Sequence, residues 1–280
     1  MAKPLVSVCC ITYNHAKFIE QCLDGFLMQK TSFDVEFLIH DDASPDRTQE
    51  VIKNKVGDDP RFKLILREQN IKSTGLAVSP ILFNLAKGKY IAFCEGDDYW
   101  IDPLKLQKQV DFLEENPDYV LVGHKVDTLN HKGIIEKNSK TPIQSFSQKE
   151  ICFNHIPTLS AVFRNVEVNF QEELQRAPSG DYILWSFLGN YGDFYLFNSS
   201  MAIYRQHQGG IWSGVSLVKK LKNSLLTREI SLRYIKDKTL SNKVNKKLCI
   251  SGMYRSLKYF DISSFLFFMR VYIKKVIKRS

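Results

Sequence analysis

The fold of this chain is decided near its amino terminus, where residues 5–14 read LVSVCCITYN. The stretch is apolar and rich in β-branched residues as far as Thr12, and the polar pair Tyr13-Asn14 follows it. Such a run is typical of a buried strand that ends in a loop. Apolar residues then recur at helical spacing from Phe18 to Leu27, so a strand, a loop and an amphipathic helix are predicted in succession.

The same alternation continues along the chain. Further strands are predicted at residues 35–40, 62–66 and 90–94. A helix is expected after Ser44, which could cap it with Pro45 in the first helical position, and another is expected to close at Gly88. This βαβαβαβ pattern predicts an α/β fold with a mostly parallel sheet flanked by helices.

Three polar clusters follow the predicted strands, namely Thr12-Tyr13-Asn14, Asp41-Asp42 and the segment from Glu95 to Asp98. Ligands of such sheets bind outside the carboxyl ends of the strands. Because parallel strands end at the same edge, the three clusters are expected to form one site.

The segment Glu95-Gly96-Asp97-Asp98 places three carboxylates within four residues. Oxygen ligands of this kind suit Mg²⁺ or Mn²⁺, ions that are usually completed by water and substrate phosphates. Asp97 and Asp98 are the preferred ligands, with Glu95 either a third ligand or an acid behind them. The alternative is a helix amino terminus, because a helical pattern begins at Leu104.

The pair Asp41-Asp42 admits two interpretations. The two acids could simply organise the turn after the second strand. Alternatively, a carboxylate can accept a hydrogen bond from the imide N–H of uracil, and backbone groups from Thr12 to Asn14 could complete a nucleoside pocket.

Charge is divided unevenly over the 280 residues. The formal net charge is +9, but residues 215–280 contain 17 Lys and Arg against three acidic residues. The remainder of the chain is therefore net acidic and holds all the candidate chemistry, so a nucleic-acid partner is not expected. The six cysteines show no C-x-x-C spacing and are expected to be buried thiols of a cytoplasmic protein rather than zinc ligands or disulfides.

Several motifs occur in a fixed order along the chain: Ser7–Asn14, Phe18–Leu23, Asp41–Thr48, Ala86–Ile91, Glu95–Leu106, Gly180–Trp185 and Tyr204–Ser213. Together they resemble the family 2 glycosyltransferases of the GT-A fold, densely from residue 5 to 120 and more weakly to about 214. Three positions depart from the usual pattern of the family: Glu95 stands where Asp is more usual, Ala43 replaces a usual Gly, and an Arg-Asn pair before Ala86 is absent.

The resemblance implies roles for later residues. Asp181 falls where the catalytic base lies, and His207 falls where a late residue helps to hold the metal or the donor diphosphate. Gly209 and Gly210 would let backbone N–H groups approach phosphate oxygens, and Trp212 belongs to the same donor-binding segment. For Asp181 the alternative is stabilisation of a helix amino terminus, and for the glycines it is an exposed loop.

The function implied by the resemblance is inverting, hexosyl-type transfer from a nucleotide-diphosphate sugar, with a UDP-sugar preferred. The acceptor is expected to be a hydroxyl of a glycan or lipid-linked acceptor in cell-surface polysaccharide synthesis. A sugar-phosphate nucleotidyltransferase would need a Gly-rich phosphate loop after the first strand, which Thr12-Tyr13-Asn14-His15 does not provide. A catalytically degenerate nucleotide-sugar or carbohydrate-binding protein is the third alternative, and the intact acids disfavour it.

The chain is predicted to divide at residue 214. Residues 1–214 would form the GT-A domain, with 1–120 as the nucleotide-sugar half and 121–214 as the acceptor half, and residues 215–280 a basic helical region. That region could be a helical hairpin packed on the main domain. The preferred interpretation is that its apolar run at 265–273 and the following Lys and Arg bind an anionic membrane surface, which would place the protein on the inner face of the cell membrane.

Overall fold

The computed structural model describes residues 3–140, 144–151, 156–167, 177, 179–210, 215–235, 238–259 and 261–277. The chain forms two compact units. The first comprises Met1–Ser145, Ile156–Gln171 and Gly192–His207. The second comprises Phe146–His155, Glu172–Tyr191 and Gln208–Ser280, so it draws on three separate segments and not on the basic tail alone.

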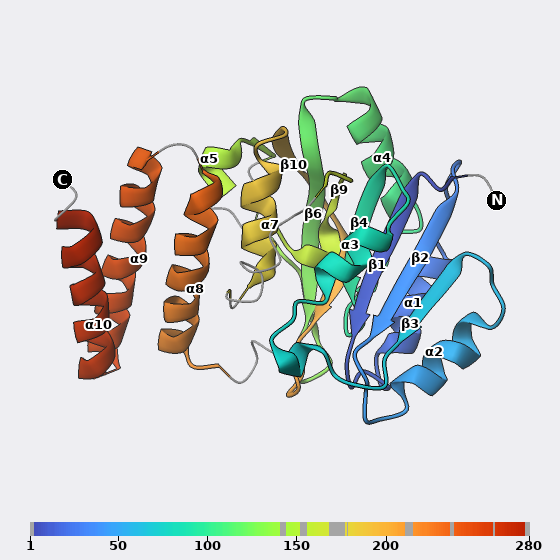
Figure 1. The fold of residues 1–280 in the computed structure, drawn as a ribbon, viewed down its shortest axis with the longest axis horizontal. Helices are drawn as coiled ribbons and strands as arrows, with labels where there is room; N and C mark the ends of the chain where they lie inside the picture. Colours follow the sequence, from blue (N-terminus) through green and yellow to red (C-terminus); the bar gives the residue numbers. More distant parts are fainter. Residues whose placement is uncertain are drawn as a thin grey trace. The chain divides into compact units, whose positions relative to one another are not determined.

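A mixed sheet forms the centre of the first unit, with strand order β3-β2-β1-β4-β9-β6-β10-β5 (Figure 1). The strands are β1 (Val6–Thr12), β2 (Val35–Asp41), β3 (Phe62–Leu66), β4 (Tyr90–Glu95), β5 (Tyr99–Trp100), β6 (Tyr119–Leu129), β7 (Ile135–Glu136), β9 (Val162–Arg164) and β10 (Asp193–Arg205). Strands β3, β2, β1 and β4 are mutually parallel, whereas β9 pairs antiparallel with both β4 and β6. The α/β fold with a mostly parallel sheet is therefore confirmed.

The helices of the first unit follow the strands as the sequence predicts. They are α1 (Ile19–Leu27), α2 (Thr48–Val56), α3 (Ser79–Leu85) and α4 (Lys105–Glu115), with short 3₁₀ turns η1 (Lys72–Thr74) and η2 (Thr158–Ser160). Helix α1 buries Ile19, Cys22, Leu23 and Phe26, which recur at helical spacing and join the main core with residues of β1, β2 and β4.

The order of the parallel strands sets the position of the site. Strand β1 lies between β2 and β4. Strands β2 and β3 are therefore added on one side of β1, and β4 is added on the other side. Ligands of open α/β sheets bind at such a switch point, outside the carboxyl ends of the strands. Register places Thr12 beside Asp41 and Ile11 beside Glu95, so the three polar clusters do emerge at one edge.

The second unit is helical, and the chain enters it within the short strand β8 (Ser145–Phe146). Its helices are α5 (Gln148–Ile151), α7 (Gly180–Leu188), α8 (Leu217–Ser231), the 3₁₀ turn η3 (Leu232–Tyr234), α9 (Lys238–Lys258), α10 (Ile262–Tyr272) and a π-helical turn η4 (Ile273–Ile277). Figure 1 shows α8, α9 and α10 standing side by side. Their small core contains Val218, Leu225, Cys249 and Phe268. The predicted helical carboxyl-terminal region is thus confirmed.

One local prediction is wrong, and one alternative is excluded. Helix α2 begins at Thr48, with Arg47 at the N-cap position, so Ser44 does not cap it. Asp97 and Asp98 do not begin a helix either, because β5 separates them from α4. Among the described cysteines, Cys9, Cys10, Cys22, Cys94 and Cys249 are buried free thiols, as expected, and Cys152 lies outside the described residues.

Candidate functional site

The acidic loop after β4 packs tightly against the end of β1. The Gly96 N–H donates a hydrogen bond to the Ile11 carbonyl at 2.9 Å. A Cβ atom at position 96 would lie 2.8 Å from the Thr12 side chain, so glycine is needed for this close approach. The loop therefore presents Asp97 at the edge where β1 and β4 end.

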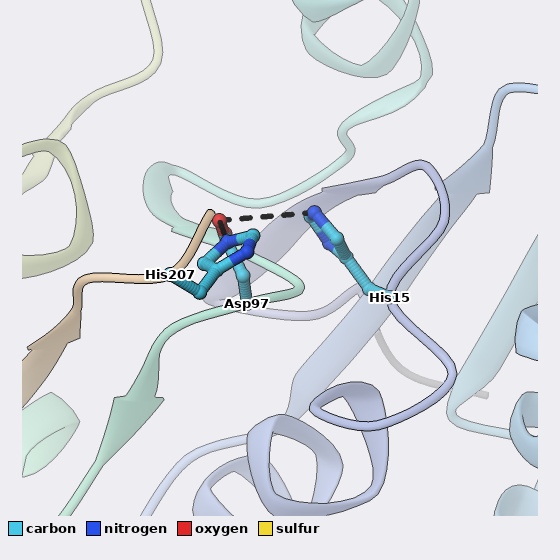
Figure 2. Close-up of side chains that lie close together, drawn as sticks. All are labelled: His15, Asp97 and His207. Atoms are coloured by element: carbon cyan, nitrogen blue, oxygen red, sulfur yellow. Dashed lines mark hydrogen bonds and ion pairs between the residues drawn. The ribbon is translucent and has the colours of Figure 1, made fainter. Parts of the chain in front are cut away.

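Asp97 lies between two histidines (Figure 2). Its Oδ2 atom is 2.9 Å from His207 Nε2 and 3.7 Å from His15 Nε2. The three side chains come from the loop after β4, the segment after β10 and the loop after β1, and each is less than one fifth exposed. One ligand atom from each lies within 4.8 Å of the others, so the group could hold a metal ion.

Asp98, predicted with Asp97 as a preferred ligand, and Glu95, predicted as a third ligand or an acid behind them, are not part of this group of three. The Asp98 side chain is 3% exposed and its Oδ1 accepts a hydrogen bond from the Arg205 backbone N–H at 2.8 Å. Burial, and then the charges of Asp97 and Glu95, raise the pKa of the Asp98 carboxyl well above its ordinary value. Asp98 thus fastens the acidic loop to β10.

Arg205 holds the same loop through its side chain. Its Nε donates to the Asp97 carbonyl at 2.9 Å, and its Nη2 donates to Gln21 Oε1 on α1 at 2.6 Å. The guanidinium also lies over the rings of Phe18 and Tyr99, 4.9 and 5.0 Å from their centroids. Since His207 follows two residues later, these contacts also fix the start of the segment that carries it.

Three carboxyl groups, those of Asp97, Asp98 and Glu95, influence the electrostatics of the site. Burial, followed by the charges of Asp98, Asp97 and Glu95, raises the pKa of the Tyr204 hydroxyl to about 12. Burial also lowers the pKa of the His15 imidazole, although the Asp97 carboxylate opposes that effect. A neutral imidazole is the form that binds a metal ion.

The loop after β2 supports the loop after β1. Asn14 has a φ of 61°, and its N–H donates to Ser44 Oγ at 2.8 Å. The His15 N–H donates to Thr48 Oγ1 at 2.9 Å, and the Ala16 N–H donates to Asp46 Oδ2 at 3.0 Å. Three consecutive backbone N–H groups are thereby tied to side chains about thirty residues later, and His15 is fixed facing Asp97.

The predicted nucleoside contacts have structural partners of their own. Asp41 Oδ1 accepts hydrogen bonds from the Ser44 N–H at 2.9 Å and from Gln49 Nε2 at 2.7 Å. Asp42 accepts from the Ile71 N–H at 2.8 Å and from the Lys72 N–H at 3.0 Å, one on each oxygen. A carboxylate oxygen can accept twice, so the role of Asp42 in nucleotide binding stays a prediction.

The remaining residues of that pocket differ in burial. Thr12 is fully buried, and its Oγ1 has no hydrogen-bond partner within the described part of the chain. Tyr13 is 45% exposed at the edge of the sheet. Gly209 and Gly210 lie in the turn that follows His207, whereas Trp212 lies outside the described residues.

Asp181, the predicted base, lies in the second unit in the first turn of α7. Its Oδ1 accepts a hydrogen bond from the Tyr182 N–H at 2.8 Å. An acid at this position of a helix is stabilised by the amino-terminal partial charge, so this contact alone does not separate a catalytic role from a structural one.

Sequence reasoning missed His15, Arg205 and Thr48 as members of the site. The available signal was weak in each case. His15 directly follows Thr12-Tyr13-Asn14, and Thr48 closes the motif that starts at Asp41, but their proximity depends on contacts between separate loops.

A sheet with this strand order, an acidic loop at its switch point and a neighbouring late histidine define the class of GT-A-fold proteins. Within that class the chain belongs to glycosyltransferase family 2, because the family described as "Glycosyl transferase family 2" matches residues 7–169. The resemblance inferred from the motifs is thereby confirmed.

Individual proteins are similar to this chain over part of its length. An uncharacterized protein of Mycobacterium tuberculosis is 35% identical over 214 residues, which is 74% of this chain and 60% of that protein. The chain thus spans about 60% of the length of this relative. The chondroitin synthase of Pasteurella multocida is 38% identical over 97 residues, covering 34% of this chain and 10% of that protein.

Among solved structures, TarS of S. aureus (residues 1–349, in complex with UDP) superposes with a TM-score of 0.63 at 18% identity, covering 90% of this chain and 72% of that chain. At this identity the likeness shows a shared fold.

Proposed function

We propose that this chain transfers a sugar from a nucleotide-diphosphate sugar, with UDP as the preferred nucleotide, to a hydroxyl group of a glycan or lipid-linked acceptor in cell-surface polysaccharide synthesis. The observation that carries the proposal is the pairing of Asp97 with His207 at the edge where β1 and β4 end. Two further facts support it: the UDP complex of the structurally similar TarS and the sequence similarity to a chondroitin synthase.

Asp97 and His207 would hold a divalent ion, Mn²⁺ or Mg²⁺. A carboxylate and an imidazole are both ligands of such ions, and the carboxyl groups of Glu95 and Asp98 lie in the same acidic segment. When bound, the ion would neutralise charge on the diphosphate leaving group. Asp98 and Glu95 would contribute to the electrostatics of the site, with Asp98 also holding the loop in place.

The nucleoside would bind over the ends of β1 and β2. Asp42 still has lone pairs to accept the uracil N3–H. The exposed Tyr13, which follows β1 at the same edge of the sheet, offers an aromatic ring face. The buried Thr12 hydroxyl and the backbone of Asn14 would complete this pocket. Gly209, Gly210 and Trp212 are proposed to contribute to donor binding from the segment after β10.

Asp181 is the proposed general base. Its carboxylate would accept the proton of the acceptor hydroxyl while that oxygen forms a bond to the anomeric carbon. The bond from this carbon to the diphosphate oxygen breaks at the same time, and the nucleoside diphosphate leaves with the electron pair. Attack from the face opposite the leaving group inverts the anomeric centre.

The first experiment is a donor screen. Purified protein is mixed with individual nucleotide sugars, with and without Mn²⁺ or Mg²⁺, and its melting temperature and the release of nucleoside diphosphate are measured. A UDP-sugar is expected to stabilise the protein only with the metal, and Asp97→Asn is expected to abolish this effect. The proposal fails if no nucleotide sugar binds or is consumed by the wild-type protein.

A second experiment tests the base. Asp181→Asn is expected to lower transfer by ~10²- to 10⁴-fold, the usual contribution of a general base, with donor affinity nearly unchanged. Glu229→Gln, on helix α8 of the same unit, is the control. Unchanged transfer by the Asp181 variant would remove this residue from the mechanism.

The second unit is further proposed to bind an anionic membrane surface on the cytoplasmic side. On α10 and η4, exposed Ile262, Leu266 and Ile273 recur at helical spacing, and Arg270 and Lys274 are exposed nearby. Asp261 is the one acidic residue from position 238 to 280. Apolar and basic side chains together are the composition of surface-bound helices. None of the helices described here has the length and hydropathy to span a bilayer.

Vesicle sedimentation tests this surface. Binding to vesicles with anionic lipid is expected to exceed binding to neutral vesicles and to weaken as salt is raised. The double change Ile262→Ser and Leu266→Ser should reduce binding, whereas Ile134→Ser, at a comparably exposed site of the first unit, should not. Equal binding to neutral and anionic vesicles would contradict the proposal.

A further inference from the structure

His15 is held more firmly than an ordinary loop side chain. Its backbone N–H is tied to Thr48, and the neighbouring N–H groups of Asn14 and Ala16 are tied to Ser44 and Asp46. Its ring lies edge-on to those of Phe18 and His207, at centroid distances of 6.3 and 6.0 Å. The orientation of this imidazole toward Asp97 is therefore built into the loop.

The ring has few competing partners. Within the described residues, Nδ1 of His15 is buried without a hydrogen-bond partner, and Nε2 lies 3.7 Å from Asp97 Oδ2, beyond ordinary hydrogen-bond length. The Nε2 nitrogen therefore faces a carboxylate oxygen across a gap that no hydrogen bond closes, and this arrangement needs an explanation. A cation held by both groups provides one.

The spacing of the three side chains fits a shared ion. An ion bound at about 2.1 Å to each ligand in six-coordinate geometry separates neighbouring ligand atoms by about 3 Å and opposite ones by about 4 Å. The separations of 2.9 and 3.7 Å from Asp97 Oδ2, with all three atoms within 4.8 Å, lie near this range. Small side-chain movements would bring all three ligand atoms to distances suitable for one ion.

We infer that His15 is a third protein ligand of the metal, and that His15, Asp97 and His207 form a two-nitrogen, one-oxygen set that selects Mn²⁺ and other transition ions over Mg²⁺. The inference rests on the proposed function, since it refines the metal site of that function. Mg²⁺ prefers oxygen ligands, whereas imidazole favours transition ions, so each imidazole shifts the preference away from Mg²⁺. Three protein ligands leave coordination positions for diphosphate oxygens and water.

The test measures metal binding without nucleotide or acceptor. Free Mn²⁺ is quantified by electron paramagnetic resonance during titration of the wild-type protein, and Mg²⁺ is then added as competitor. Wild type is expected to bind Mn²⁺. Displacement of half of the bound Mn²⁺ should require a Mg²⁺ concentration at least ~100-fold above the Mn²⁺ concentration. His15→Ala should weaken Mn²⁺ binding by ~10- to 100-fold or more and narrow the preference over Mg²⁺.

Matched variants keep the result interpretable. His15→Gln retains much of the side-chain volume and serves if His15→Ala does not fold, as judged by circular dichroism. His131→Gln, at an exposed turn of the same unit, is the control and should bind Mn²⁺ as wild type does. Co²⁺ provides an independent readout, because loss of a nitrogen ligand changes its visible absorption spectrum.

Two failures are distinguishable. If His15→Ala and His15→Gln bind Mn²⁺ with wild-type affinity and wild-type competition by Mg²⁺, or if wild type binds no Mn²⁺, the inference is overturned even where donor turnover is present. If His15 proves to be a ligand but no nucleotide sugar is bound or consumed, the proposed function fails while the metal site stands.

Discussion

Ala43 has a φ of 60°, in the left-handed region that a side chain disfavours. It occupies the turn between Asp42 and Ser44, where the family usually has glycine. Because the backbone keeps this conformation despite the Cβ atom, the turn carries a strain that glycine would not have.

Ala43→Gly is therefore expected to raise the free energy of unfolding by about 1 kcal/mol, since left-handed backbone costs an L-residue about 1–2 kcal/mol and glycine's added unfolded-state entropy offsets part of this. Urea denaturation measures the change. Ala86→Gly is the control, because Ala86 has an ordinary φ of −67° and the same substitution there should destabilise. If both variants are less stable than wild type, the backbone at Ala43 is not strained.

Lys105 is a fully buried lysine at the start of α4. Its Nζ donates to Gln109 Oε1 at 2.7 Å and lies 4.1 Å from the centroid of the Trp100 ring. Burial lowers the pKa of its ammonium group from 10.5 to about 7, although Cys94 and Asp102 oppose the shift. The folded protein therefore releases this proton more readily than the unfolded chain does.

The sign of the pH dependence follows from that difference. Between pH 7 and 10.5 the unfolded chain binds a proton at Lys105 that the folded protein does not, so this group makes stability rise with pH, by up to ~1.4 kcal/mol per pH unit. Lys105→Met should remove this contribution. Urea denaturation of both proteins at pH 7, 8 and 9 compares the slopes, and parallel slopes would contradict the lowered pKa.

At the scale of elements, the loop after β2 acts as a support for the loop after β1. Thr48 begins α2 and also accepts the His15 N–H, so one side chain connects the helix to the candidate metal site.

Thr48→Val, which is close in shape, should leave the His15 N–H unsatisfied and cost about 1 kcal/mol of stability. Backbone amide exchange in residues 14–16 should accelerate, and Mn²⁺ affinity should fall several-fold. Thr31→Val removes a hydroxyl that donates to the nearby Phe33 carbonyl at 2.8 Å, and it serves as control. Unchanged exchange in residues 14–16 would show that the loop does not depend on this bond.

The sequence predicts the regular elements of this region well and their cross-connections poorly. Strands β1 to β4 follow from local apolar runs, and burial on both faces keeps this signal continuous in β1, β2 and β4. Ser44 was expected to cap α2, but its hydroxyl instead accepts the Asn14 N–H from thirty residues earlier. The two-residue strand β5 was missed because its partner, β10, lies about a hundred residues away.

In the candidate site, too, residues with a local signal could be predicted and residues that depend on contacts between loops could not. Asp97 and His207 could be proposed from residue type, spacing and family resemblance, and the structure brings them within 2.9 Å. His15 could not, because nothing in its local sequence indicates that a turn with Asn14 at positive φ directs its ring toward Asp97.

At the scale of the whole molecule, the described residues of the first unit and those of helices α8 to α10 each form a hydrophobic cluster. The core of the first unit includes residues of β1, β2, β4 and several helices. Among the described residues, that of α8 to α10 includes Val218, Leu225, Cys249 and Phe268, with a few half-buried neighbours. Local stability follows buried apolar contact, so the units are not expected to unfold together.

Hydrogen exchange at increasing urea concentrations should therefore show that amides of α9 and α10 open at a lower free energy than those of β1 and β4. Mn²⁺ with UDP should raise protection chiefly in β1, β4 and the loops after them, because bound ligand stabilises the unit that holds it. Identical opening free energies in both units would contradict this separation.

The order in which these parts are synthesised has a consequence for biogenesis. His15 and Asp97 leave the ribosome early, but Arg205 and His207 belong to the end of β10, and Arg205 anchors the acidic loop that carries Asp97. A nascent chain that ends at residue 169, where the family match stops, has the acidic residues without their anchor or the second histidine. On the proposed function, metal capture would then be a late step of maturation, and a prematurely terminated polypeptide would lack two of the residues proposed to hold or position the ion.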